Sequence, residues 1–287
     1  MLSPGSIERR DVDYQLIAFD MDGTLLDTSK RVLPSSTQAI DEAVAAGKDV
    51  AICSGRSPKM IELDHASFGQ VRYAICCNGT VLYDLREHRV LSTTSFDHEV
   101  ITRAVRAVGA ADAMIDVFSG AEMYCQTTDL ARMDHYRMGI YRGLYDATST
   151  PVENVRERLL DPATSVQKFI FHFADPASRP IARERLRDLP VELAESEDAS
   201  LELSPAGATK GSGLLALAQL LGIPREATIA VGDAENDLPM LSVAGLGIAM
   251  GNATEEARAV ADVVVADNDH DGCAEAIRRF LLGGERA

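Results

Sequence analysis

Residues 14–27 read YQLIAFDMDGTLLD, a mostly apolar segment followed at once by an acidic turn. The run Tyr14–Phe19 has the length and composition of a strand that is buried on both faces, as strands of parallel sheets are. Asp20 and Asp22 follow directly after this run. Ligands of open parallel sheets bind beyond the carboxyl ends of the strands. The stretch therefore predicts a fold with a parallel sheet, and it also predicts the edge of that sheet at which a ligand binds.

The same pattern recurs along the chain, with short apolar runs that end in polar residues. Segments with helical spacing separate the runs, and Gly47 and Gly222 stand where two of these helices would end. Ser35 and Gln38 have the spacing of a capping box for the first helix. Alternation of strands and helices predicts an α/β fold, a doubly wound parallel sheet of Rossmann-like type. The further strands are expected at 50–53, 73–77, 228–231, 246–250 and 263–265.

The middle of the chain differs from both ends because it is richer in Arg, Tyr and Met. It contains expected strands at 168–173 and 191–194 and an expected charged helix at 179–189. We therefore predict a catalytic core formed by residues 1–84 and 199–287, with a smaller α/β cap domain, residues 85–198, inserted into it. One continuous large sheet is the alternative, and the chain length disfavours it.

The chain has 287 residues and a formal net charge of −16, with 46% apolar and 25% charged residues. These values are typical of a soluble globular protein that buries a core without disulfides. Nucleic-acid binding is not expected, because no dense basic run is present. An anionic ligand would need a local positive site, built from a metal ion and a few Lys or Arg side chains.

Location follows from cysteine usage and the absence of targeting segments. The five cysteines lack metal-ligand spacing and are interpreted as buried free thiols of a reducing compartment. Residues 1–13 lack the apolar core of a signal peptide, and no stretch approaches 18 apolar residues. We expect a cytoplasmic protein that binds neither membrane nor nucleic acid; its oligomeric state stays open.

Polar side chains gather where the predicted strands end. Converging carboxylates repel one another unless a cation lies among them, and oxygen ligands without a His or Cys cluster favour Mg²⁺ over zinc. A phosphate ester is a ligand on which such a site can act. One carboxylate of Asp20 and Asp22 can attack its phosphorus, and the other can protonate the leaving oxygen. Lys210 and the Ser54 hydroxyl can hold phosphate oxygens. The full set is Asp20, Asp22, Ser54, Asn78, Lys210, Asp233, Asn236 and Asp237.

Four motifs in order resemble the signatures of the haloacid dehalogenase-like superfamily. They are Asp20–Asp27, Ser54-Gly55-Arg56, Lys210-Gly211 and Gly232–Asp237. With the insertion after the third strand, Asn78-Gly79 and Met250–Ala253, the chain resembles the Cof-type branch, which contains many sugar-phosphate phosphatases. Ser54 departs mildly, since many relatives carry Thr there, but it keeps the hydroxyl.

The resemblance implies a role for each residue. Asp20 would be the nucleophile and Asp22 the general acid/base. Mg²⁺ would be bound by the Asp20 carboxylate, the Asp22 main-chain carbonyl and Asp233, with Asp237 supporting the metal site from close by. The phosphate would be bound by Ser54, Gly55, Lys210 and Asn236. The expected function is hydrolysis of a small phosphate ester, such as a sugar phosphate, through an aspartyl phosphate.

Other interpretations stay open at this stage. A phosphomutase can share the core and the aspartyl phosphate, and a receiver-like signalling module uses Asp, Mg²⁺, a hydroxyl and Lys; Asp22 argues against the second. Residues 267–272 match the opening of a calcium loop, but Arg278 stands where a Glu is required. In the middle segment, Arg137 and Arg142 are candidates for substrate contact, and an exposed helix face explains them equally well.

Overall fold

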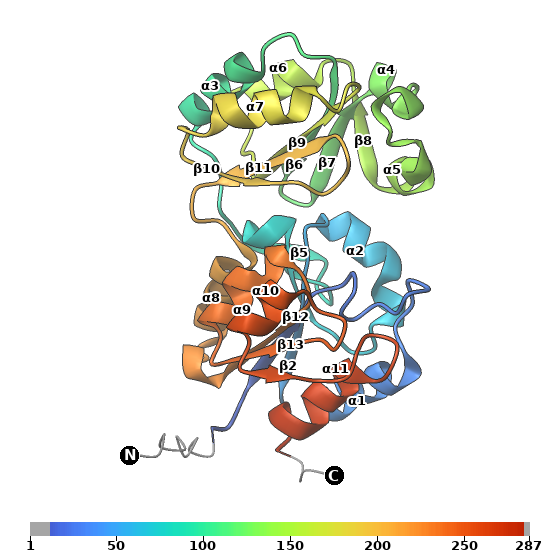
Figure 1. Cartoon of the computed structure of the whole chain (residues 1–287), viewed down its shortest axis with the longest axis vertical. Helices are drawn as coiled ribbons and strands as arrows, with labels where there is room; N and C mark the ends of the chain where they lie inside the picture. The colour runs from blue at the N-terminus through green and yellow to red at the C-terminus, as the bar shows by residue number, and fades with distance from the viewer. Residues whose placement is uncertain (1–11, 284–287) are drawn as a thin grey trace.

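The computed structural model describes residues 12–283, so almost all of the segment 1–13 discussed above lies outside the described residues. The chain forms two lobes, each built around its own sheet and stacked along the long axis of the molecule (Figure 1). The larger lobe combines the N-terminal and C-terminal parts of the described chain. The smaller lobe is formed by the middle part.

The larger lobe contains an eight-stranded sheet in the order β14-β13-β12-β1-β2-β3-β4-β5. The first six strands of this order are parallel, and β4 and β5 add an antiparallel hairpin at the edge. Strand β1 lies inside the parallel part, between β12 and β2, and its four residues are fully buried, as the apolar run predicts. The α/β prediction is confirmed. The bounds are β1 Leu16–Phe19, β2 Asp49–Cys53, β3 Tyr73–Cys76, β4 Val81–Asp84, β5 Arg89–Thr93, β12 Thr228–Gly232, β13 Leu246–Ala249 and β14 Val263–Val264.

Helices cover both faces of this sheet, as a doubly wound fold requires (Figure 1). The capping box expected at Ser35 and Gln38 is wrong: Pro34 is the first helical residue, Leu33 is the N-cap, and no side chain caps the helix. Proline fixes φ for the first turn, which sets this helix start. The Ser35 hydroxyl donates to Asp271 instead. The helices are α1 Pro34–Ala45, α2 Pro58–Asp64, α8 Lys210–Leu221, α9 Leu238–Val243, α10 Glu255–Val260 and α11 Gly272–Ala276, which continues as a π-helix over Ile277–Leu281.

The smaller lobe contains a six-stranded sheet in the order β10-β11-β9-β6-β7-β8. Alternate residues of β9 divide its two faces: Phe169 and Phe171 pack in a separate apolar core, whereas Lys168 faces the larger lobe. The strands are β6 Ala113–Ser119, β7 Glu122–Gln126, β8 Ser149–Val152, β9 Lys168–Phe173, β10 Val191–Ala194 and β11 Ser200–Pro205. The helices are α3 His98–Val108, α4 Thr127–Leu130, α5 Arg142–Thr148, α6 Val155–Leu160 and α7 Ser178–Leu186.

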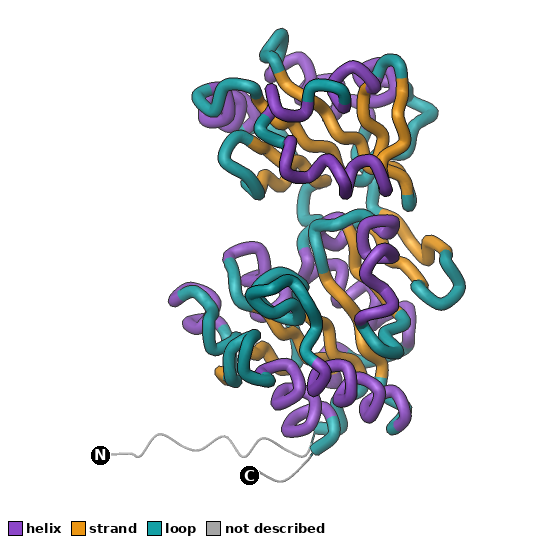
Figure 2. Tube along the Cα trace, turned by 90° about the vertical axis from the view of Figure 1, so that its right-hand side faces the viewer, coloured by secondary structure: helices purple, strands orange, loops and turns teal. Residues whose placement is uncertain are grey.

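Loop segments connect the two lobes (Figure 2). They lie at different places in the sequence from those predicted. We expected crossings near Asp84 and Ala199, but β5 belongs to the large sheet and β11 to the small one. The crossings therefore lie after Thr93 and after Pro205. Strands β5 and β11 each extend a sheet by pairing with strands that are antiparallel or distant in sequence. No change in amino-acid composition marks the residue at which either strand ends.

Gly79 determines how closely the turn after β3 packs against α8. Its φ is +99°, and a Cβ there would lie 2.0 Å from the carbonyl oxygen of Thr209, the residue that caps α8. A Cβ would therefore meet both an unfavourable backbone conformation and a clash with main chain. The close packing in turn positions Lys210, the first residue of the helix.

We expect Gly79→Ala to lower the free energy of unfolding by roughly 2–5 kcal/mol, from left-handed strain plus overpacking. The measurement is urea unfolding followed by circular dichroism. Gly143→Ala is the matched control, because Gly143 lies in α5 with nothing within 4 Å of the added methyl group. A loss below roughly 1 kcal/mol for Gly79→Ala would contradict this packing argument.

All five cysteines are buried free thiols, as predicted. Burial raises the pKa of each thiol above the ordinary value, so all five stay protonated near neutral pH. The five are Cys53, Cys76, Cys77, Cys125 and Cys273. Among the described residues, no helix has the length and apolar character needed to span a membrane.

Candidate active site

The parallel strands bring four segments of the chain to one edge of the large sheet. Asp20 follows β1, Ser54 follows β2, and Asp233 follows β12; β1 is paired with both of the other strands. Lys210 opens α8 and reaches the same edge. Its Nζ lies 2.5 Å from Oδ1 of Asp20 and 2.7 Å from Oδ1 of Asp237. Lys210 and the two aspartates, which are far apart in sequence, thus form one buried ionic cluster.

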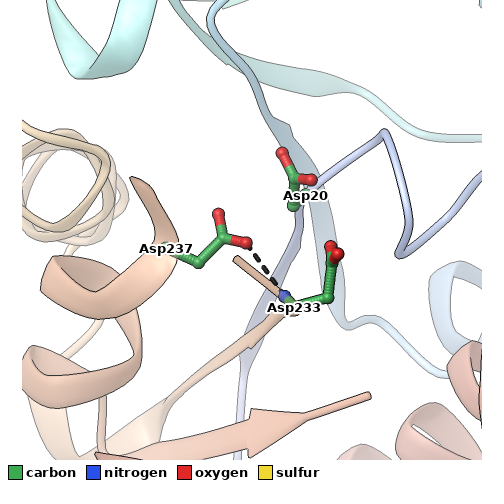
Figure 3. Close-up of side chains that lie close together, drawn as sticks. All are labelled: Asp20, Asp233 and Asp237. Atoms are coloured by element: carbon green, nitrogen blue, oxygen red, sulfur yellow. Dashed lines mark hydrogen bonds between the residues drawn. The ribbon is translucent and has the colours of Figure 1, made fainter. Parts of the chain in front are cut away.

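Asp20, Asp233 and Asp237 form an acidic group around this lysine. One carboxylate oxygen from each lies within 4.8 Å of the others, and Figure 3 shows the three side chains converging from neighbouring segments. Burial raises the pKa of Asp20 to about 7, with Asp237 adding to the rise and Lys210 opposing it. Burial is also the main cause of the raised pKa of Asp233. One ammonium group faces three carboxyl groups, so the cluster favours an additional cation.

Asp237 has both carboxylate oxygens occupied. Oδ1 accepts a hydrogen bond from Lys210, and Oδ2 accepts from the main-chain N–H groups of Asp233 and Ala234, at 2.9 and 3.1 Å. The first contact holds the ammonium group of Lys210 toward Asp20. The other two shape the turn that presents Asp233. Asp237 therefore fixes the positions of Lys210 and the Asp233 turn, while the carboxylate oxygens of Asp20 and Asp233 keep more lone pairs free for a ligand.

The acidic turn after β1 is locked to the turn after β12. Gly23 has φ +84°, and a Cβ there would lie 2.4 Å from Oδ2 of Asp233, so only glycine fits this approach. The Thr24 hydroxyl donates to Oδ1 of Asp233 at 2.7 Å, and the Asn252 amide donates to the Gly23 carbonyl at 2.8 Å. Thr24 and Asn252 had no role assigned from sequence, although both stand in recognisable motifs.

Asp22 is placed differently from Asp20. Its side chain is 47% exposed and pairs with Lys30 at 2.7 Å and with Arg56 at 3.0 Å. Burial acts to raise the pKa of Asp22, but the bonds to Lys30 and Arg56 outweigh it and the pKa falls below the ordinary value. The structure therefore brings Asp22 to the rim of the cluster as a carboxylate, held by two cations that sequence reasoning did not connect with it.

The predicted phosphate-binding residues differ in their surroundings. The Ser54 hydroxyl is buried and accepts from the main-chain N–H of Arg56 at 3.3 Å. Gly55 is half-buried, and the Asn236 side chain is exposed with no hydrogen bond to the described part of the chain. Asn78, which follows β3, donates from its main chain to the Ser54 carbonyl at 3.1 Å. Ser54 and Gly55 are thus held in a fixed loop, whereas Asn236 is free to meet a ligand.

The smaller lobe contributes Tyr141 near this rim. Its hydroxyl donates to Glu197. Burial raises the pKa of Tyr141 to about 12, with Glu197 and Asp22 adding and Arg56 opposing, so the phenol lies within electrostatic reach of the Asp22–Arg56 pair. Arg137 is exposed and lines a hollow of about 600 Å³ together with Arg179 and residues 195–198.

Other polar side chains of the smaller lobe have structural partners. Arg142 donates to the Leu130 carbonyl at 3.1 Å, which anchors a local turn. His135 bonds Asp112 at 2.7 Å, and His172 lies buried between Asp116 and Ser200.

The acidic loop 267–272, which resembles the opening of a calcium loop, is tied to the core. Asp269 accepts from both the main chain and the hydroxyl of Thr28, at 2.8 and 2.6 Å. Asp271 accepts from Ser35. Carboxylates of this loop therefore anchor it to the segment between β1 and α1 and to the first turn of α1.

Curated proteins match the chain along nearly its whole length. The 5-amino-6-(5-phospho-D-ribitylamino)uracil phosphatase YcsE of Bacillus subtilis is 29% identical over 282 residues, covering 96% of this chain and 100% of that protein. The pyridoxal phosphate phosphatase YbhA of Escherichia coli is 30% identical over 278 residues, covering 93% and 99%. A chloroplastic endoribonuclease YBEY of Arabidopsis thaliana is 27% identical over 94% of this chain, which spans only 47% of that longer protein.

A solved structure and a family model agree with these matches. A haloacid dehalogenase-like hydrolase from B. subtilis superposes with a TM-score of 0.77 at 26% identity, covering 93% of this chain and 100% of the other. The family model of haloacid dehalogenase-like hydrolases matches residues 17–277, a range that holds the complete ionic cluster and the acidic turn. On this match and on the four motifs that meet at one sheet edge, the chain belongs to the haloacid dehalogenase-like hydrolase family.

Proposed function

We propose that this hydrolase is a Mg²⁺-dependent phosphatase that removes the phosphate group of a small metabolite through an aspartyl phosphate on Asp20. The observation that carries the proposal is the buried cluster in which Lys210 contacts both Asp20 and Asp237, with Asp233 alongside. The family and the phosphatases among its relatives give the reaction class, a phosphoric monoester hydrolase.

Asp20 is the nucleophile in the proposed reaction. An Asp20 carboxylate oxygen forms a bond to phosphorus, and the bond from phosphorus to the ester oxygen breaks. Asp22 gives a proton to that leaving oxygen. Water, deprotonated by Asp22, then attacks the phosphorus of the aspartyl phosphate, which releases inorganic phosphate and restores Asp20. Lys210 and Ser54 bind the phosphate oxygens through both steps.

The donor set of the site fits Mg²⁺. It offers carboxylate oxygens of Asp20 and Asp233, and the cluster has more carboxyl groups than Lys210 can neutralise. We propose that these two side chains and the Asp22 carbonyl hold the ion, while Asp237 orients Asp233 and Lys210 around it. Bound there, Mg²⁺ would supply Lewis acidity and neutralise phosphate charge.

The proposal is tested by phosphate release from a panel of sugar phosphates, nucleotides and cofactor phosphates, with Mg²⁺ and with excess chelator. We expect release in Mg²⁺ and loss in chelator, restored when Mg²⁺ is added back. Interconversion of sugar phosphates without release would indicate a mutase. A phosphoprotein that outlives the assay would indicate a signalling module. Either result, or release that is unaffected by chelator, would contradict the proposal.

We propose that the smaller lobe selects the leaving group. YcsE and YbhA act on a phosphoribitylamino-uracil and on pyridoxal phosphate according to their names, and for this chain we propose a sugar phosphate or a similar phosphomonoester. The supporting observation is that Tyr141 of the smaller lobe lies within electrostatic reach of the Asp22–Arg56 pair and donates to Glu197, which lines the same hollow as Arg137.

Arg137→Ala is therefore expected to raise KM for the preferred substrate of the panel by roughly tenfold, the scale of one lost charged hydrogen bond. Acetyl phosphate, which has no large leaving group, should be hydrolysed unchanged. Steady-state kinetics on both substrates measures the difference. Arg142→Ala is the matched comparison, because Arg142 already bonds the Leu130 carbonyl. Equal losses on both substrates would exclude a role of Arg137 in selectivity.

A further inference from the structure

The loop Ser54-Gly55-Arg56 has all three of its main-chain carbonyls occupied. Asn78 donates to the Ser54 carbonyl at 3.1 Å and Cys77 donates to the Arg56 carbonyl at 3.0 Å, both from the main chain of the larger lobe. The middle carbonyl, that of Gly55, accepts from Nζ of Lys168 at 3.1 Å. Lys168 opens β9 of the small sheet, so one of the three loop carbonyls accepts its hydrogen bond from the other lobe.

The ammonium group of Lys168 is held in place by its own lobe. The side chain is 2% exposed, Nζ lies 2.5 Å from Oε2 of Glu202, and the Phe118 ring centroid is 5.2 Å away. Phe118 stands directly opposite Lys168 on β6, and Glu202 comes from β11 on the other side. Burial acts to raise the pKa of Glu202, but Lys168 and further hydrogen bonds lower it below the ordinary value, so the pair is ionic.

The same pair also contacts the larger lobe at a second point. Oε2 of Glu202 accepts from the Asn78 side-chain amide at 3.0 Å. A Cβ on Gly55 would lie 3.0 Å from Oδ1 of Asn78 and 3.7 Å from Nζ of Lys168, so the loop packs closely against both side chains. Lys168 and Glu202 thus contact the loop on one side and its Asn78 support on the other.

The consequence for the phosphate site follows from the planarity of the peptide bond. The Gly55 carbonyl and the Arg56 N–H belong to one planar group and point in opposite directions, so a donor on the carbonyl also fixes the N–H. That N–H donates to the Ser54 hydroxyl oxygen at 3.3 Å. With its oxygen engaged in this way, the hydroxyl keeps its own proton for another acceptor.

We propose that Lys168, oriented by Glu202, is a positioning residue for phosphate binding, because it fixes the peptide group that directs the Ser54 hydroxyl. The proposal rests on the proposed function, which assigns phosphate binding to Ser54 and Gly55. It implies that the loop reaches its binding geometry only while the smaller lobe lies against it. Lys168 acts through the loop and does not contact the reacting atoms.

The test is the double variant Lys168→Met with Glu202→Gln. Removing Lys168 alone would leave a buried unpaired carboxylate, whereas the glutamine is neutral and still accepts from Asn78. We expect binding of inorganic phosphate, measured by calorimetry with Mg²⁺ present, to weaken about tenfold. KM should rise by a similar factor for acetyl phosphate and for the preferred substrate alike, with kcat changed much less.

A second ion pair between the lobes provides the matched control. Nζ of Lys59 lies 2.6 Å from Oε2 of Glu122, and this pair does not contact the loop carbonyls. Lys59→Met with Glu122→Gln should leave phosphate affinity within about twofold of the wild-type value. The same tenfold loss in this control would show that the ion pairs only hold the lobes together, and it would overturn the proposal.

Wild-type phosphate affinity in the Lys168/Glu202 double variant would also overturn it. If that variant does not fold, Glu202→Gln alone decides, because it frees the orientation of Lys168 and keeps its contact with Gly55. We then expect a roughly two- to fivefold loss of phosphate affinity, and no loss would refute the role. Failure of the proposed function is a separate result, since the wild-type protein would then release phosphate from no substrate of the panel.

Discussion

Asp20→Asn is expected to abolish turnover, with no phosphate release above that of the protein-free reaction. An amide nitrogen or oxygen cannot replace the anionic carboxylate that attacks phosphorus, so no covalent intermediate forms. Lys210 keeps its partner Asp237 in this variant, at 2.7 Å, so the geometry around the lost group should persist. The measurement is single-turnover phosphate release together with mass spectrometry for the phosphorylated protein.

Stability offers an independent readout for this variant. The pKa of Asp20 in the folded protein is about 7, above its ordinary value of 3.8, so ionisation disfavours the folded state. Asp20 therefore lowers stability progressively as pH rises from about 4 to about 7, and the neutral amide removes this effect. In metal-free buffer at about pH 8, above this window, we expect the Tm of the Asp20→Asn protein to equal or exceed that of the wild type.

Asp49→Asn is the matched control for Asp20→Asn. Asp49 begins β2, so it lies at the opposite edge of the sheet from the ionic cluster, and the substitution is the same. It should retain activity within about twofold of the wild-type value. Near-normal turnover by folded Asp20→Asn protein would refute the covalent mechanism.

Asp22→Asn is expected to reduce kcat by roughly 10²–10⁴-fold, the usual scale of a positioned acid or base. The loss should be larger for an alkyl phosphate than for p-nitrophenyl phosphate, whose leaving group needs no proton. The amide of Asn cannot act as a general acid or a general base. Asn has nearly the size of Asp, so the turn that carries it should keep its conformation. Kinetics on both substrates, combined with a pH profile, measures the effect.

The ion pairs of Asp22 sharpen this prediction. Lys30 and Arg56 favour the carboxylate form, which suits the base that activates water in the second step. Proton donation in the first step requires Asp22 to leave these cations. Arg56→Gln removes one of them and should raise the pKa of Asp22, so the acidic limb of the pH profile, which reports its role as a base in the second step, should move to higher pH. Equal losses for both leaving groups in Asp22→Asn would argue against an acid role.

Much of the fold was predictable because its signals are local. A buried parallel strand needs a short apolar run, and the residue after it necessarily stands at the ligand-binding edge. Asp20, Ser54 and Asp233 could therefore be placed together from sequence alone, and Lys210 was a further candidate because its ammonium group can hold phosphate oxygens. The structure brings Lys210 within 2.5 Å of Asp20, across 190 residues of chain.

Local sequence patterns are enough to predict the class of fold, the edge of the sheet that carries polar residues, and the family to which the motifs point. The pairing of Asp22 with Lys30 and Arg56, and the contact of Lys168 with the loop at Gly55, become visible only in the folded chain. Lys168 and Gly55 are separated by 113 residues; Gly55 follows a strand of the large sheet, whereas Lys168 belongs to the small sheet. No local period records such a pairing, because it depends on how two lobes pack after each has formed its own secondary structure.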